Sequence, residues 1–180
     1  MDLAENYLSS SINEFKKLKK LCERALALIK PEDYFFQLDE NSNSIAIIIR
    51  HLSGNMISRW TDFLVTDGEK LWRNRDEEFE QLFYTDIDDI NERWEKGWNV
   101  LFSTLNSLKP NDLMRTVKIR NEDHSVIEAI NRQLSHYGYH AGQIIYLAKH
   151  LAGNNWESLS IEKGKSKEFN DKKMGSNKTG

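Results

Sequence analysis

Proline is nearly absent from this sequence: only Pro31 and Pro110 occur among its 180 residues. Helix interiors exclude proline because it lacks a backbone N–H and clashes with the preceding turn. Long helices are therefore permitted almost everywhere, and we expect two of them to end at these prolines. Residues 3–29 place apolar side chains three or four positions apart, which predicts an amphipathic first helix that ends before Pro31.

Three further segments carry the same helical spacing of apolar residues. Each is preceded by residues whose side chains can accept a hydrogen bond from the first helical turn: Ser44, then Thr85 or Asp86, then Asp123 or Ser125. The predicted helices cover residues 44 to about 66, 86–108, and 125 to about 151.

The connections between these segments lack that pattern. Residues 69–84 are a long polar and aromatic stretch with room for one helical turn, and residues 111–125 fit a brief extended piece. With four long helices and no convincing strand, the chain is predicted to be all-α, a four-helix bundle over residues 1–156 with a crossover between its second and third helices. Residues 157–180 form a lysine-rich tail, expected to dock in its first part and to be mobile over its last ten residues.

Charge and cysteine content narrow the class of protein. The formal net charge is −3, so no basic excess is available to neutralise phosphates, and nucleic-acid binding is disfavoured. The single cysteine, Cys22, excludes a disulfide within the chain and favours a reducing compartment. The first twenty residues lack the apolar core of a signal peptide, and the longest apolar run, residues 45–49, is too short to span a bilayer. We therefore expect a cytoplasmic protein that does not bind membranes.

Two histidines stand four residues apart in HYGYH, residues 136–140. At 100° per residue, His136 lies about 40° from His140, and the apolar stripe of Ile144 and Leu147 shares their arc. Both imidazoles are therefore predicted to face the interior, where side chains at i and i+4 can bind one ion at ~2.0–2.1 Å. The spacing alone does not distinguish a metal site from packed core histidines.

The second predicted helix carries His51 within a column of polar residues. Ser44, Asn55, Ser58 and Asp62 all lie within about 40° of it on the helical wheel. Buried polar groups need partners, which neighbouring helices, a wet cleft or a metal can supply. The residues expected to line a pocket at this site are Asn55, Ser58, Arg59, Asp62, Gln133 and Tyr137.

Three inward histidines on two helices make His51, His136 and His140 a candidate set of metal ligands. Imidazole accepts several divalent ions, of which we expect Zn or Ni. No glutamate follows His136, so the general base of helical metalloproteases is missing and protease chemistry is disfavoured. The sequence identifies no catalytic side chain.

Three stretches carry a family resemblance: RHLSGNMISRWTDF, DGEKLWRNRDEEF and LSHYGYHAGQIIYLAK. They resemble the DinB superfamily, also called DinB/YfiT-like, and within it the DUF1572 group. The similarity extends to SLSIEKGKSKEFN in the tail, where Glu162 replaces a proline usual in the family. The resemblance implies a four-helix bundle of up-down-down-up topology and a divalent metal held by three histidines, which match His51, His136 and His140. It also implies a homodimer, because homodimers are common in the superfamily.

The superfamily includes S-transferases and an isomerase that use the thiols bacillithiol or mycothiol. We therefore expect a metal-dependent enzyme acting on a small molecule, either a thiol-dependent transferase with a low-molecular-weight thiol or a hydrolase. The alternative is a non-catalytic bundle that binds metal or dimerises. A third reading, DNA binding, rests only on the superfamily's name and conflicts with the acidic balance of charge.

Overall fold

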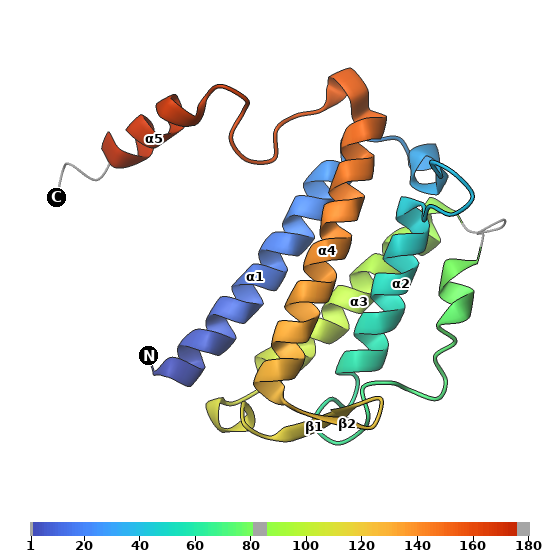
Figure 1. Ribbon diagram of the computed structural model, residues 1–180, viewed down its shortest axis with the longest axis vertical. Coiled ribbons are helices and arrows are strands. Elements are labelled where there is room, and N and C mark those ends of the chain that lie inside the picture. Colours follow the sequence, from blue (N-terminus) through green and yellow to red (C-terminus); the bar gives the residue numbers. More distant parts are fainter. Residues whose placement is uncertain (1, 81–85, 176–180) are drawn as a thin grey trace.

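The computed structural model describes residues 2–80 and 86–175, which form five α-helices and one two-stranded antiparallel sheet (Figure 1). Helices α1 to α4 lie side by side and share one apolar core, whereas α5 lies apart from them at the end of an extended segment (Figure 1). The elements are α1 (Leu3–Leu26), α2 (Ile45–Trp60), α3 (Ile87–Ser107), β1 (Thr116–Ile119), β2 (Glu122–Ser125), α4 (Val126–Ala152) and α5 (Ser166–Gly175).

Side-chain caps begin these helices where the sequence predicted them. The hydroxyl of Ser44 accepts a hydrogen bond from the third backbone N–H of α2, and Asp86 does the same for α3. At α4 the hydroxyl of Ser125 accepts from the N–H of Glu128, whose carboxylate accepts from the N–H of Ser125, which completes a capping box. The alternative cap Thr85 lies outside the described residues.

Helix α2 ends at Trp60, so the predicted extension to Thr66 is wrong. Thr61 is extended, with ψ at 127°, and Asp62 has a φ of 50°, in the left-handed region that few residues other than glycine occupy. The Trp60 carbonyl, released from the helix, accepts a hydrogen bond from the hydroxyl of Thr104 on α3 at 2.8 Å. Asp62 is therefore not on the helical column of His51.

The all-α prediction is also wrong in one detail, because the connection before α4 contains a β-hairpin. Strands β1 and β2 pair antiparallel from Thr116 with Ser125 to Ile119 with Glu122. The two turn residues, Arg120 and Asn121, both have positive φ, as a type I′ turn requires. The carboxylate of Asp67 accepts hydrogen bonds from both turn N–H groups, at 2.9 and 2.7 Å. This contact ties the hairpin to the segment that follows α2.

A buried aromatic cluster fills the centre of the molecule and ends in a polar chain. Phe15, Trp60, Trp98 and Tyr137 are each less than 2% exposed. The indole N–H of Trp60 donates to the Tyr137 hydroxyl at 3.1 Å, and that hydroxyl donates to Oδ1 of Asn55 at 2.9 Å. The apolar core is thereby joined to the polar column of α2 without an unpaired hydroxyl.

The tail begins against the helices and continues away from them. Leu159 packs against the core, and its carbonyl accepts a hydrogen bond from Arg24 at 2.8 Å. Helix α5 is exposed along its length (Figure 1). It includes residues 171–175 of the stretch predicted to be mobile, while residues 176–180 lie outside the described chain. No helix in the described part is both long and apolar enough to cross a membrane.

Candidate metal centre

Three histidines from two helices converge inside the molecule. His51 projects from α2, and His136 and His140 project from successive turns of α4. Their ring centroids are 4.8 to 5.4 Å apart, and one nitrogen of each lies within 4.8 Å of the others. His51 and His140 are buried and His136 is partly buried. The cluster could therefore hold one metal ion.

The Nε2 atoms that face one another in the cluster have a spacing that fits such an ion. Nε2 of His51 lies 3.3 Å from Nε2 of His136. Two ligands held at ~2.0–2.1 Å in a tetrahedral site are about 3.3 Å apart, so this pair has the spacing of ligands that share an ion. Nε2 of His140 is buried and has no hydrogen-bond partner among the described residues. A cation held by the three rings would satisfy this buried nitrogen.

Polar partners fix the orientation of two of the rings. Nδ1 of His51 lies 2.9 Å from Oε2 of Glu78, and Nδ1 of His140 lies 2.8 Å from Oε1 of Gln143. Because these oxygens accept the proton on Nδ1, the lone pair of each ring is left on Nε2. Such outer partners orient metal-binding imidazoles and raise their basicity.

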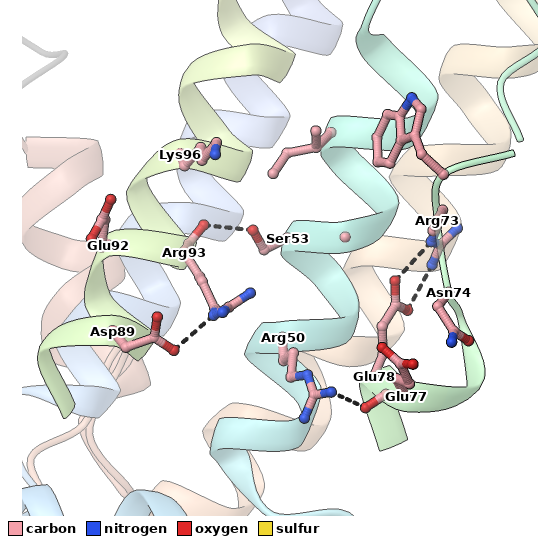
Figure 2. Close-up of a pocket in the computed structure, with 13 residues that line it drawn as sticks. Arg50, Ser53, Arg73, Asn74, Glu77, Glu78, Asp89, Glu92, Arg93 and Lys96 are labelled. Carbon is pink, nitrogen blue, oxygen red and sulfur yellow. Dashed lines mark hydrogen bonds and ion pairs between the residues drawn. The ribbon is translucent and has the colours of Figure 1, made fainter. Parts of the chain in front are cut away.

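Glu78 is held in place by a second, stronger contact. The guanidinium of Arg73 forms a fork with its carboxylate, with both N–O distances at 2.8 Å (Figure 2). Burial acts to raise the pKa of Glu78, but the hydrogen bonds from Arg73 and His51 outweigh it and lower the pKa below its usual value. Glu78 is therefore an anion at neutral pH, paired with one arginine and one histidine.

Glu78 lies between the histidines and a cavity on its other side. A cavity of about 600 Å³ lies between α2, α3 and the segment 72–78, and Figure 2 shows Glu78, Arg73 and Arg50 on its wall. Gly54 of α2 lines the same cavity and faces the carboxylate. A Cβ at Gly54 would overlap Oε1 of Glu78. Glycine at this position therefore leaves room for the carboxylate.

Replacing Gly54 with alanine should weaken both the fold and metal binding. Alanine favours a helix over glycine by ~1 kcal/mol, yet here the new methyl would displace the carboxylate from His51 and Arg73. The control is Gly142→Ala on α4, where a Cβ meets nothing within 4 Å. Urea unfolding should show a lower free energy of unfolding for Gly54→Ala and no decrease for Gly142→Ala. Equal effects would contradict the role assigned to Gly54.

Acidification should destabilise the metal-free protein. Burial, with the neighbouring histidines adding to it, lowers the pKa of His136 to about 3, and burial lowers that of His140 to about 4. In an unfolded chain histidine titrates near ~6.5, so between pH ~6.5 and ~4 the unfolded state binds more protons. The free energy of unfolding should then fall as pH falls, by up to about 1.4 kcal/mol per pH unit for each histidine. Urea midpoints at pH 7, 6 and 5 measure this decline, which His136→Ala should reduce.

A cavity of about 400 Å³ opens beside the three histidines. Of the residues predicted to line a pocket, the structure places Asn55, Arg59 and Gln133 on its wall. Tyr137 is buried behind His136, with the two ring centroids 5.5 Å apart. The described residues that line it are Asn43, His51, Asn55, Arg59, Arg73, Arg75, Phe79, Arg120, Arg132, Gln133, His136, Tyr139, His140 and Gln143.

Two predicted pocket residues lie elsewhere. Ser58 is fully buried, where its hydroxyl donates to the carbonyl of Gly68 at 2.9 Å and accepts from the N–H of Lys70 at 3.1 Å. It therefore holds the segment after α2 rather than a ligand. Asp62 follows the end of α2 and lies beside Phe63, away from the histidines.

Sequence reasoning missed several residues that surround the histidines. Glu78 and Phe79 come from the connection 69–84, where no periodicity indicated a direction for any side chain. Gln143 could have been found, because it stands three residues after His140 on the same helix and so lies next to it.

Comparison with known proteins agrees with the resemblance to the DUF1572 group. Among curated proteins, no match to the chain was found. The profile of a family described as "Protein of unknown function (DUF1572)" matches residues 2–165, which include all three histidines and Glu78. Because the match covers most of its length, this chain belongs to the DUF1572 family.

Proposed function

We propose that this protein is a divalent-metal-dependent enzyme that acts on a small molecule. The observation that carries the proposal is the convergence of His51, His136 and His140 beside an open cavity of about 400 Å³. Catalytic metal sites keep a position free for water or substrate, whereas structural sites are closed by four protein ligands. Three imidazoles with a cavity on one side match the first arrangement.

A bound Zn or Ni ion would act as a Lewis acid and lower the pKa of a coordinated water or thiol. The chain's own residues prepare the site for it. Glu78 and Gln143 fix two rings with Nε2 free, and burial keeps His136 and His140 neutral. Phe79 lies against His51 with the ring centroids 4.8 Å apart and shields that ring from water.

Thiol transfer fits the cavity better than hydrolysis. Among the described residues no carboxylate lines the cavity, so a general base for activating water is not at hand. Cys22 cannot supply the thiol, because it is buried on α1 and burial raises its pKa to about 12. The thiol would therefore be a separate low-molecular-weight molecule.

The proposal extends to the fold and its context. Four long helices with a three-histidine cluster fit an up-down-down-up four-helix bundle of the DinB-like superfamily. We further propose a homodimer in a reducing cytoplasm, since the single cysteine needs no oxidising compartment. Analytical ultracentrifugation of the full chain tests the dimer.

Metal analysis of untagged protein tests the function. The chain should take up about one Zn or Ni per molecule, and the loaded protein should consume a thiol such as cysteine, glutathione, bacillithiol or mycothiol in the presence of an electrophile. Turnover that depends on the ion supports the enzyme. Metal uptake without turnover across these thiols supports the non-catalytic alternative, and no metal uptake contradicts the proposal.

A further inference from the structure

The cavity beside the histidines is lined by positive charge. Its wall contains five arginines, and among the described residues no aspartate or glutamate lines it. This contrasts with the whole chain, in which acidic residues outnumber basic ones by 28 to 25. The positive lining is therefore a local feature of the cavity. The five arginines are Arg59, Arg73, Arg75, Arg120 and Arg132.

Ion pairs within 4.0 Å do not balance this charge. Within the described chain, Glu69, Glu78 and Asp76 are the carboxylates that lie within 4.0 Å of these guanidiniums. Three negative charges against five positive ones leave an excess of two. The Glu78 carboxylate also accepts a hydrogen bond from Nδ1 of His51, so it is shared between Arg73 and a second partner.

One member of the lining has donors that no residue of the described chain satisfies. Arg59 is 4% exposed, yet its Nε and Nη1 have no hydrogen-bond partner. A buried guanidinium without its hydrogen bonds is costly, so such groups indicate a ligand that completes them.

Arg132 adds a charge at the same wall. Its side chain is exposed, and no carboxylate of the described residues forms an ion pair with it. The positive charge of Arg132 is close enough to help lower the pKa of Arg59, after burial itself. Two guanidiniums that repel each other are brought together at low cost when an anion binds between them.

We infer that this cavity binds the anionic group, a carboxylate or a phosphate, of the small molecule whose reacting end faces the three histidines. Guanidiniums match both groups because each offers oxygens that can accept paired N–H bonds. The inference rests on the proposed function for the claim that the ligand is a substrate. The recognition of an anion itself depends only on the arginines.

Titration calorimetry at pH 7.5 and constant ionic strength tests the inference with malonate, its neutral analogue malonamide and inorganic phosphate as probes. Malonate or phosphate should bind and malonamide should not, and the stronger anion identifies the preferred group. The double variant Arg75→Gln/Arg132→Gln should weaken anion binding by ~10-fold or more. Both side chains are exposed, so the variant should fold. The control is Arg115→Gln, an exposed arginine paired with Asp112 outside the cavity.

The same titrations on metal-free and Zn-loaded protein separate this inference from the proposed function. If the chain takes up no metal yet binds malonate in an arginine-dependent way, the inference stands and the enzyme proposal falls. If the chain binds Zn but prefers neither anion over malonamide, the inference falls alone. Equal weakening by the Arg115→Gln control would also overturn it, because the anion would then be held by general surface charge.

Discussion

Replacing His140 with alanine should abolish metal binding, from about one ion per chain to below ~0.1. The substitution removes one of three nitrogens that lie within 4.8 Å of one another, and leaves His51 and His136 as a two-ligand site. Two imidazole ligands alone compete poorly with water for a divalent ion. Elemental analysis after gel filtration in micromolar chelator measures the loss.

The metal-free fold should survive this substitution. Nε2 of His140 is buried and has no hydrogen-bond partner among the described residues, so its removal takes away an unsatisfied group as well as packing. Thermal unfolding of the metal-free forms should therefore differ little between the variant and the parent. Unfolding of the parent when the ion is removed would instead indicate a structural metal.

His150→Ala is the matched control. It lies on α4 as well, but its side chain is exposed and ten residues beyond His140. This variant should keep its full metal content. If the two alanine variants retained the same amount of metal, the ion would be bound elsewhere, and the histidine cluster could not be the site.

Helical periodicity predicted α1 to α4 because each helix buries one stripe against a shared core. The prediction failed where the backbone takes a positive φ, which the spacing of apolar residues does not reveal. Residues 61–66 continue the apolar spacing of α2, but Asp62 takes a positive φ and the chain turns away. The hairpin 116–125 was seen only as an extended piece, since its Arg120-Asn121 turn lacks the usual glycine.

In the candidate site, too, residues on regular helices were predicted and those on irregular connections were not. Helical geometry brought together His51, His136 and His140, and also Asn55, Arg59 and Gln133, because all of them project from regular helices. The partners that orient the histidines include Glu78, which arrives from an irregular connection 27 residues away from His51 in sequence. A long-range contact of that kind has no local signal in the sequence.

Truncating Glu78 to alanine should therefore affect fold and site together. It leaves the Arg73 guanidinium, whose side chain is 3% exposed, without its forked partner. Breaking a buried ion pair by removing one member costs about 3–5 kcal/mol, and here we expect the lower end because Glu69 lies 3.6 Å from Arg73. For a chain of this size, about 3 kcal/mol corresponds to a decrease in Tm of ~6–12 °C.

The same variant should bind the ion ~10- to 100-fold more weakly, because His51 loses the acceptor that fixes its ring. Glu77→Ala is the control. The Glu77 side chain is exposed, and the hydrogen bond from Arg50 goes to the backbone carbonyl of Glu77, which alanine keeps. Calorimetric Zn titrations and thermal melts of both variants measure the two effects. A destabilised Glu78→Ala that binds the ion as tightly as Glu77→Ala would confine Glu78 to a structural role. Loss of both properties in Glu78→Ala alone would show that one carboxylate supports the fold through Arg73 and the site through His51.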